Sequence, residues 1–488
     1  MISNHLFDHL FENGQPDSWV LKTSDLQLSY ADLNRATARF ANQLELLGVK
    51  PGDRVAVQVD KSVANVILYL ATIRAGAVFL PLNTAYTPAE MAYFVGDAEP
   101  TLIVCDPAAR EALSAIAAGA RLETLDANGE GSLAAAAGRT DDFATVPREP
   151  SDLAAICYTS GTTGRSKGAM LTHGNLASNA ATLKDLWRFT ADDVLIHALP
   201  IYHVHGLFVA INTLMTAGGS MNFQAKFDPD AVLAAMPRAT ALMGVPTFYT
   251  RLLAHPGLTR AATAGMRLFV SGSAPLLAQT HADFEDRTGH AILERYGMTE
   301  TGMNTSNPYD GARIAGTVGF QLPGVSVRVA APSGEIGVVE VKGPNVFAGY
   351  WRNPEKTAAE FRADGYFITG DLGQFDERGY LSIVGRGKDL IISGGLNIYP
   401  KEIETELDAL PGVAESAVIG LPDADFGEQV VAILVAEKGA RLDETAILGE
   451  LSSRLARFKQ PKRLIVVDDL PRNAMGKVQK ALLRERYG

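Results

Sequence analysis

The sequence contains little cysteine. Only Cys105 and Cys157 occur among 488 residues, each inside an apolar run. Two isolated cysteines exclude a framework of several disulfides and a Cys-x-x-Cys metal site, and they fit a reducing compartment. Long apolar runs are also missing, because the most apolar stretch, 63–80, is interrupted by Asn65 and Arg74. We therefore expect a buried helix in this stretch and no membrane span.

The sequence also lacks an excess of positive charge. Its 44 Lys and Arg residues are outnumbered by 55 Asp and Glu, giving a net charge of −11. This balance excludes a non-specific nucleic-acid binder, although a local site can still bind a small anion. The N-terminus has no basic segment of the kind found in signal peptides, and Asp8 and Glu12 interrupt its apolar pattern. We expect a cytoplasmic protein with no nucleic-acid or membrane partner.

What is present is an ordinary globular composition, with 47% hydrophobic and 20% charged residues. Helical and strand-like patterns alternate in the first 150 residues, with a helix expected over 33–47 and strands at 54–59 and 102–105. Such alternation is typical of βαβ units in a largely parallel sheet. The last hundred residues predict a small α+β unit, with strands at 417–421 and 430–437.

A loop rich in small hydroxyl residues follows the predicted strand at 153–158. It reads Tyr158-Thr-Ser-Gly-Thr-Thr-Gly-Arg-Ser-Lys167-Gly168. Small residues allow backbone N–H groups to surround an anion, and Lys167 adds a point charge, which together suit a triphosphate. The loop is not a Walker A motif, because Gly168 follows the lysine where that motif has Ser or Thr. The alternative is a flexible surface turn.

A second polar segment, Glu294-Arg-Tyr-Gly-Met-Thr-Glu-Thr301, ends a predicted strand in a Thr–Glu pair. A carboxylate at this place could serve Mg²⁺, which prefers carboxylates, waters and substrate phosphates. The alternative is a network of salt bridges at the end of a strand.

Two weaker patterns lie further along the chain. Asp371 follows Gly370 at a strand end and could accept both hydroxyls of a ribose, with Arg386 as a further contact. A solvated turn is the alternative for both residues. Lys477, in Pro471-Arg-Asn-Ala-Met-Gly476-Lys477, is by itself a typical solvated surface lysine.

The order and spacing of these segments resemble those of the adenylate-forming superfamily, which includes acyl-CoA synthetases, firefly luciferase and nonribosomal-peptide adenylation domains. The resemblance covers essentially the whole chain. Within the superfamily, stretches such as LPIYHVHGLF, GVPTFYTRLL, LFVSGSAPL and ERYGMTETGMNTSNPYDG are similar to those of bacterial malonyl-CoA and methylmalonyl-CoA synthetases.

The resemblance implies an α/β fold with a large N-terminal body of several subdomains and a small, mobile α+β lid. The body, with parallel and mixed sheets, would span residues 1–386, and the lid 387–488, with a hinge near Lys388. In the implied reaction, a carboxylate attacks the α-phosphate of Mg-ATP to give an acyl-adenylate and pyrophosphate. The lid then rotates, and the thiol of coenzyme A displaces AMP. ATP, Mg²⁺ and coenzyme A are the implied cofactor and co-substrates.

The resemblance also assigns roles to individual residues. Those implied to hold the phosphates are Thr159, Ser160, Gly161, Thr162, Thr163, Gly164 and Lys167. Those implied to line the adenine pocket are Gly272, Ser273, Ala274, Pro275, Glu294, Arg295, Tyr296, Gly297 and Met298, with Tyr296 stacked on the ring. The implied catalytic residues are Thr299 at the α-phosphate, Glu300 at magnesium, His203 near the acyl pocket, and Lys477 between carboxylate and α-phosphate. Asp371 and Arg386 would bind the ribose.

Malonate presents a second carboxylate that must be neutralised in a pocket with little water. Arginine suits this task because its planar fork can bind a carboxylate bidentately. The malonyl-CoA synthetases use two arginines and a serine, which match Arg251, Arg295 and Ser273 here, with His203 close by. The alternatives are that Arg251 only satisfies carbonyls at a helix end and that Arg295 only pairs with a neighbouring carboxylate.

Three other functions stay open. The first is a synthetase for another small acid, such as methylmalonate, succinate or an aryl acid. The second is an adenylation enzyme that feeds a carrier protein, and the third is a nucleotide sensor without catalysis. The segment from Pro471 to Lys477 also resembles the pattern at which a lysine acetyltransferase modifies this superfamily, which makes such an enzyme a candidate partner.

Overall fold

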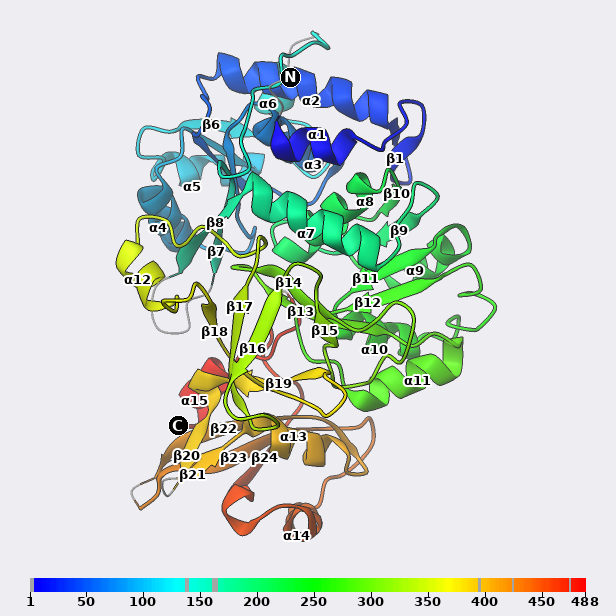
Figure 1. Ribbon diagram of the computed structural model, residues 1–488, viewed down its shortest axis with the longest axis vertical. Coiled ribbons are helices and arrows are strands. Elements are labelled where there is room, and N and C mark those ends of the chain that lie inside the picture. The colour runs from blue at the N-terminus through cyan, green and yellow to red at the C-terminus, as the bar shows by residue number, and fades with distance from the viewer. Residues whose placement is uncertain (1–3, 137–139, 160–165, 394–395, 424, 474) are drawn as a thin grey trace.

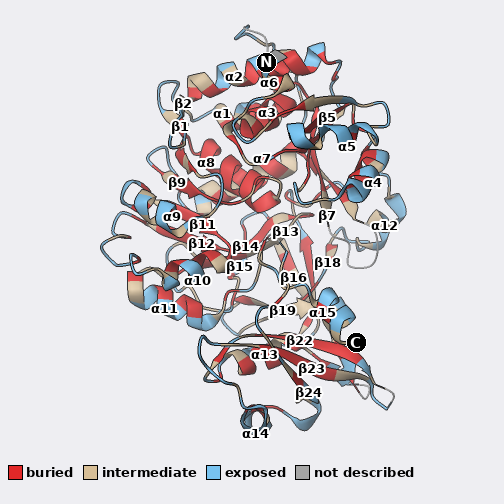
Figure 2. Ribbon diagram, turned by 180° about the vertical axis from the view of Figure 1, so that it is seen from behind, coloured by how far each residue is buried: buried red, intermediate tan, exposed pale blue. Residues whose placement is uncertain are grey.

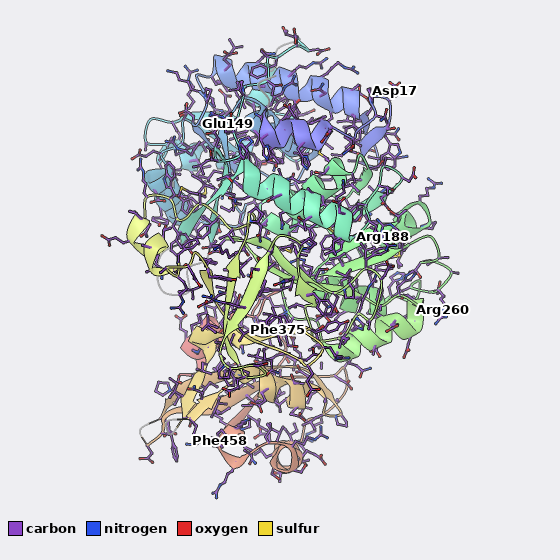
Figure 3. All side chains as sticks on the ribbon, viewed as in Figure 1. Asp17, Glu149, Arg188, Arg260, Phe375 and Phe458 are labelled. Atoms are coloured by element: carbon purple, nitrogen blue, oxygen red, sulfur yellow. The ribbon has the colours of Figure 1, made fainter. Side chains whose placement is uncertain are left out.

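The computed structural model describes residues 4–136, 140–159, 166–393, 396–423, 425–473 and 475–488. The phosphate-loop residues Ser160, Gly161, Thr162, Thr163 and Gly164 lie outside the described residues. The molecule is elongated, with the N-terminal helices at one end and the C-terminal elements at the other (Figure 1). Phe458, in the C-terminal part, lies far from Asp17 (Figure 3).

The first sheet has six strands in the order β6-β5-β3-β4-β7-β8. Its strands pair in parallel except for the antiparallel hairpin of β7 and β8. Their bounds are β3 Arg54–Gln58, β4 Val78–Pro81, β5 Leu102–Cys105, β6 Arg121–Thr124, β7 Leu153–Thr159 and β8 Lys167–Thr172. The loop of the hairpin is the segment predicted to hold phosphates.

The second sheet has nine strands in the order β15-β14-β13-β12-β11-β9-β10-β1-β2. The run from β13 to β1 is parallel, and antiparallel strands continue it at both edges. Their bounds are β1 Trp19–Lys22, β2 Gln27–Ser29, β9 Val194–His197, β10 Ser220–Phe223, β11 Ala241–Gly244, β12 Leu268–Ser271, β13 Leu293–Met298, β14 Gly302–Ser306 and β15 Phe320–Gln321.

Helices surround and connect these sheets. The α-helices of the body are α1 His5–Phe11, α2 Tyr30–Leu46, α3 Val63–Arg74, α4 Pro88–Ala98, α5 Arg110–Ser114, α6 Ser132–Ala136, α7 His173–Leu186, α8 Thr213–Thr216, α9 Pro229–Ala235, α10 Pro246–Ala254, α11 Ala278–Thr288 and α12 Pro354–Ala359. Short 3₁₀ turns are η1 Pro107–Ala109 and η3 Met236–Arg238, and η2 His205–Asn212 is a π-helix.

Helix α3 lacks a polar face, and a helix that is apolar all round is expected to be buried. In the structure its residues from Asn65 to Arg74 are buried, as the sequence predicted. Tyr69 of α3 contacts Phe79 of β4 on one side and Phe208 of η2 on the other. The buried helices therefore join the first sheet to the elements of the second, and they fill the centre of the body (Figure 2).

A four-stranded antiparallel sheet follows, formed by β16 Ser326–Ala330, β17 Gly337–Lys342, β18 Phe367–Phe375 and β19 Leu381–Arg386. The C-terminal elements then form a five-stranded sheet of β20 Ile391–Ser393, β21 Leu396–Ile398, β22 Val413–Asp423, β23 Gly427–Ala436 and β24 Arg463–Val467. Its helices are η4 Gly387–Asp389, α13 Pro400–Asp408, α14 Glu444–Arg454, η5 Arg457–Lys459 and α15 Lys480–Tyr487.

The C-terminal sheet has its own apolar clusters. Ile403 of α13 and Leu451 of α14 belong to one of them, and Leu483 of α15 to the other. Met475, by contrast, belongs to the large apolar core of the body. The segment before Lys477 therefore inserts a side chain into the body.

The structure confirms the predicted α/β fold, with parallel and mixed sheets and a small α+β C-terminal part. The sequence pattern of residues 444–458 predicts a single helix, but α14 ends at Arg454. Leu455 is extended, and the 3₁₀ turn η5 ends at Lys459. The next residue, Gln460, is extended because it precedes Pro461, and such a residue avoids the helical region. Across the described ranges, no helix is long and apolar enough to cross a membrane.

Candidate active site

The end of the site predicted to bind ribose is built on the β18–β19 hairpin. Asp371 and Arg386 are cross-strand partners, and Arg386 Nε lies 2.6 Å from Asp371 Oδ1. The hydroxyl of Tyr296, from β13, donates to Asp371 Oδ2 at 2.5 Å. Burial and the charge of Asp371 raise the pKa of this tyrosine. The structure therefore brings Tyr296, Asp371 and Arg386 together, as expected for residues that share one nucleoside.

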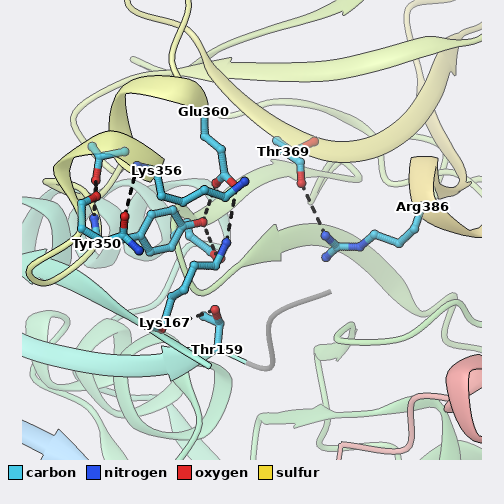
Figure 4. A network of polar contacts seen from close by, with 10 residues as sticks. Thr159, Lys167, Tyr350, Lys356, Glu360, Thr369 and Arg386 are labelled. Atoms are coloured by element: carbon cyan, nitrogen blue, oxygen red, sulfur yellow. Dashed lines mark hydrogen bonds and ion pairs between the residues drawn. The ribbon is translucent and has the colours of Figure 1, made fainter. Parts of the chain in front are cut away.

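Lys167, the first residue of β8, faces the segment that follows β17. Its Nζ lies 3.4 Å from Glu360 Oε1 and 4.4 Å from the centre of the Tyr350 ring (Figure 4). The Tyr350 hydroxyl contacts both Glu360 Oε2, at 2.6 Å, and Glu300 Oε1, at 3.1 Å. One tyrosine thus links the predicted magnesium carboxylate to a second carboxylate that pairs with the predicted phosphate lysine.

Glu300 lies in the turn between β13 and β14, next to Thr299. It is buried, and burial raises its pKa above the ordinary range. Within the part of the chain that is described, no three His, Cys, Asp or Glu side chains are grouped closely enough to hold a metal ion. Mg²⁺ is usually held by one or two carboxylates together with substrate phosphates, and a single carboxylate here fits that mode.

The predicted adenine segment combines backbone contacts with one buried acid. A Cβ on Gly297 would lie 2.1 Å from the carbonyl oxygen of Gly302, so only glycine allows β13 and β14 to approach here. Glu294 is buried, its Oε1 accepts a hydrogen bond from the Gly316 amide at 3.1 Å, and burial raises its pKa to about 8. Met298 is half-buried at the end of the same strand.

The side chain of Arg295, on β13, is buried beside the loop that follows β12. Its side chain occupies the space that a Cβ on Gly272 would need, since that atom would lie 2.4 Å from Arg295 Cζ. The residue is 4% exposed, and its Nε and Nη2 have no hydrogen-bond partner among the described residues. Burial lowers the pKa of the guanidinium to about 9. Burying a cation without a partner destabilises the folded protein. We therefore expect an anionic ligand to pair with the guanidinium of Arg295.

Two histidines and Ser273 lie around Arg295. His205 Nδ1 is 3.2 Å from Ser273 Oγ, and the His205 amide donates to His203 Nδ1 at 3.3 Å. Burial, assisted by Arg295, lowers the pKa of His203 to about 4 and that of His205 well below its ordinary value. Ser273 has a φ of 73°, a strained conformation for a residue with a Cβ. Ala274 and Pro275 continue the same loop towards the surface.

The π-helix η2 begins at His205, and π-helical turns are often found at functional sites. Its second residue, Gly206, accepts a hydrogen bond from His197 Nε2 at 2.8 Å. On the other side of the imidazole, Lys61 Nζ lies 2.9 Å from His197 Nδ1. A row of buried polar contacts, from Lys61 through His197 to Gly206, thus connects the loop before α3 to the start of η2.

Arg251 lies in the last turn of α10 and is exposed. It shares a helix face with Thr247, four residues earlier, whose side chain lies 3.4 Å from the place that a Cβ on Gly476 would take. Arg251 is therefore on the side of α10 that faces the segment with Lys477. No hydrogen bond or ion pair joins it to Arg295 or to another described residue.

Lys477 is exposed as a residue, but burial of its amine and the charges of Arg386 and Lys388 lower its pKa. The positive charge of Arg386 also lowers the pKa of Lys388, although burial is the larger cause there. The segment of Lys477 is thus directed at the ribose end of the site. Lys388 itself lies in η4 and is exposed.

Sequence reasoning missed His205, Tyr350 and Glu360. His205 stands two residues after His203 and could have been found from this spacing, because it begins the segment that lies against Ser273. Nothing in the sequence around Tyr350 and Glu360 distinguishes them from residues of a surface turn. Thr159, which was predicted, ends β7 opposite Lys167 and is half-buried.

Comparison with known proteins decides the family. The AMP-binding enzyme family matches residues 10–351, and the AMP-binding enzyme C-terminal domain matches residues 402–477. The chain belongs to the AMP-binding enzyme family. The resemblance to adenylate-forming enzymes is therefore confirmed.

Individual members of this family match along almost the whole chain. The solved structure of ATP-bound MatB from Rhodopseudomonas palustris is 62% identical, covers 99% of both chains and has a TM-score of 0.97. A feruloyl-CoA synthase from an Amycolatopsis species is 39% identical over 97% of this chain and 96% of its own length. A malonate–CoA ligase from Arabidopsis thaliana is 36% identical over 97% of this chain and 84% of its own length.

The arrangement of the two parts of this AMP-binding enzyme resembles one state of MatB more than another. The TM-score is 0.97 with the ATP-bound structure and 0.87 with the apo structure, although both are 62% identical to this chain.

Replacement of Glu294 by Gln tests the buried acid of this AMP-binding enzyme. The folded pKa, about 8, lies above the ordinary 4.5, so the folded protein holds a proton that the unfolded chain releases between these pH values. Wild-type stability therefore falls as pH rises from about 4.5 to 8, while a Gln side chain carries no such dependence. We expect the melting temperature of Glu294→Gln, relative to wild type, to increase steadily from pH 5 to pH 8.

The control for this experiment is Glu285→Gln, which removes an exposed carboxylate from α11. Differential scanning calorimetry at three pH values is the measurement. A constant difference between Glu294→Gln and wild type across this range would contradict a proton held by Glu294.

Proposed function

We propose that the protein is an ATP-dependent ligase that converts malonate and coenzyme A to malonyl-CoA, AMP and pyrophosphate through malonyl-adenylate. The comparisons confirm the predicted class of enzyme, an AMP-forming acid–CoA ligase, and the acid is the proposed part. The observation that supports malonate is the unpaired buried guanidinium of Arg295. A pocket for an aryl or fatty acid would place an apolar side chain there, because the ligand would leave the charge unpaired.

The relatives support this assignment without agreeing on one acid. Malonate–CoA ligases from Arabidopsis thaliana and from mouse are 36% and 33% identical to this chain. The feruloyl-CoA synthases reach 39%, and ferulate, the acid from which feruloyl-CoA is formed, has a single carboxylate. Identity to these curated relatives therefore does not discriminate between the acids, and the chemistry of the pocket has to.

In the proposed pocket, the distal carboxylate of malonate binds Arg295 and Ser273. His203 and His205 stay neutral near pH 7 because their pKa values are lowered, so they can donate or accept hydrogen bonds without adding charge. Arg251, on the lid-facing side of α10, would approach the same carboxylate from the open end. The reacting carboxylate would then point towards Thr299 and the α-phosphate of ATP.

At the nucleotide end, Asp371 and Arg386 would hold the ribose, and Tyr296 would lie against adenine with the segments around Gly272 and Glu294. Thr159 and Lys167 would hold the phosphates, together with loop residues outside the described part. Glu300 would hold Mg²⁺, which neutralises phosphate charge when bound. Fixed cations aimed at the developing charge lower the barrier of such a transfer by a few kcal/mol.

We further propose that residues 387–488 move as a lid about Lys388, with residues 1–386 as the fixed body. The present arrangement, with Met475 in the core of the body and Lys477 near Arg386, suits the adenylation step. Rotation would withdraw Lys477 and admit coenzyme A. The free, buried Cys105 and Cys157 support a cytoplasmic location. An acetyltransferase acting on Lys477 would remove the charge that adenylation needs.

A panel of acids tests the substrate. We expect AMP formation with malonate, ATP and coenzyme A, and a kcat/KM for acetate or propionate lower by about 10⁴-fold, because these acids leave Arg295 unpaired. Methylmalonate and succinate are included because they also carry a second carboxylate. A preference for ferulate or another aryl acid would overturn the malonate assignment while leaving the class of enzyme intact.

Substitution of the two arginines tests the pocket. Arg295→Met should lower kcat/KM for malonate by about 10²-fold or more, since truncating one partner of a buried charge pair costs several kcal/mol. Arg251→Ala should also lower it, because the open end of the proposed pocket then lacks its cation. ATP binding, measured by calorimetry without acid, should stay unchanged in both variants. Arg260→Ala, an exposed arginine near α11 (Figure 3), is the control. Wild-type malonate kinetics in both variants would exclude this carboxylate site.

Removal of Lys477 separates the two steps of the reaction. Lys477→Ala should lower the rate of malonyl-adenylate formation by about 10²-fold or more, because a charge placed at the transition state is lost. Thioester formation from supplied malonyl-adenylate and coenzyme A should continue near the wild-type rate. Lys438→Ala removes an exposed lysine from the same C-terminal part and is the control. An equal loss in both steps would contradict a role confined to adenylation.

A further inference from the structure

Glu360 lies between two lysines in the phosphate region. Its Oε1 is 2.7 Å from Lys356 Nζ and 3.4 Å from Lys167 Nζ, while its Oε2 accepts the Tyr350 hydroxyl at 2.6 Å (Figure 4). Burial alone would raise the pKa of Glu360, but Lys356, Tyr350 and Lys167 together hold it below the ordinary value. Glu360 is therefore an ionised carboxylate with three partners.

Lys167 is the predicted phosphate lysine, yet here its nearest anion belongs to the protein. The side chains of Lys167 and Glu360 are each 19% exposed, so water screens their attraction only in part. A phosphate group that takes Lys167 must draw it away from Glu360. A leaving pyrophosphate, in turn, has Glu360 as the group that can take its place at Lys167.

Lys356 sets how strongly Glu360 attracts Lys167. It lies four residues before Glu360, at the shorter of the two distances, and it is the more exposed lysine, with 38% of its side chain accessible. A carboxylate already paired with Lys356 attracts a second ammonium group less. Lys356 thus leaves Lys167 available to phosphate.

We propose that Glu360 competes with pyrophosphate for Lys167 and thereby promotes release of that product, with Lys356 tuning the competition. This inference rests on the proposed function, because it assumes that Lys167 binds phosphate. Glu360 is in this account a positioning residue, since it acts on the nucleotide through Lys167. Tyr350, which contacts both Glu360 and Glu300, keeps the carboxylate in place.

The test is inhibition by inorganic pyrophosphate at saturating Mg²⁺, with direct calorimetric binding of Mg-pyrophosphate in the absence of acid. Glu360→Gln should bind pyrophosphate roughly fivefold more tightly, the scale of a partly exposed ion pair, and should lower KM for ATP. Its kcat should fall because the product leaves more slowly. A merely structural role for Glu360 would weaken binding, so unchanged or weaker pyrophosphate binding overturns the proposal.

Lys356→Met should have the opposite effect, since Glu360 then attracts Lys167 alone and pyrophosphate binds more weakly. In the Glu360→Gln background, Lys356→Met should leave pyrophosphate affinity unchanged. This double-mutant cycle distinguishes an effect of Lys356 that acts through Glu360 from a general loss of positive charge. An equal effect of Lys356→Met in both backgrounds overturns the tuning role. Glu355→Gln, an exposed acid of the same helix, is the matched control.

Failure of the proposed function gives a different pattern. If the acid panel selects another acid, the calorimetric pyrophosphate results are unaffected and still decide the role of Glu360. If Lys167→Met leaves pyrophosphate binding unchanged, Lys167 does not hold phosphate, and the competition is overturned together with that assignment. Melting temperatures of all variants identify any that fail to fold.

Discussion

A buried positive charge without a protein partner is the interaction on which the acyl end of the site depends. Arg295 is 4% exposed, and two of its nitrogens have no hydrogen-bond partner in the described part of the chain. Such a charge is unfavourable until an anion pairs with it. The surroundings limit the cost: Gly272 leaves room for the guanidinium, and His203 and His205 remain neutral because their pKa values are lowered. The protein is acidic overall, but the charge near Arg295 is locally positive.

The phosphate end uses the opposite arrangement. Lys167, the proposed phosphate lysine, already pairs with the carboxylate of Glu360, which a bound phosphate would have to displace. The difference follows from the charge of the two ligands. If a protein carboxylate were already paired with Arg295, a substrate carboxylate would gain little by replacing it. Arg295 is therefore left unpaired in the absence of substrate. A triphosphate or pyrophosphate has several charges and can displace a glutamate, which then remains close enough to return when the phosphate leaves.

The sequence was sufficient for the features that depend on local patterns. Alternating elements predicted the parallel sheets. The resemblance assigned Asp371 and Arg386 to one ribose, and in the structure they pair across the β18–β19 hairpin. The pairing of Lys167 with Glu360 joins residues 193 positions apart, and no local pattern specifies it. The sequence also does not show which part of the protein the Arg251 side chain faces. A helix face is readable from spacing, but whether that face meets the pocket or the C-terminal segment depends on how two separately folded parts are arranged.

That arrangement has an electrostatic consequence. Lys477 brings its amine towards Arg386 and Lys388, and both cations, together with burial, lower its pKa. Asp371 and Asp389 oppose this repulsion, but Asp371 is already paired with Arg386 at 2.6 Å. Under the proposed function, the anionic nucleotide would therefore stabilise this arrangement of the two parts more than the protein alone does. Once pyrophosphate has left, fewer negative charges hold the three cations together. In the proposed reaction, withdrawal of Lys477 before the thioester step would therefore become easier once adenylation is complete.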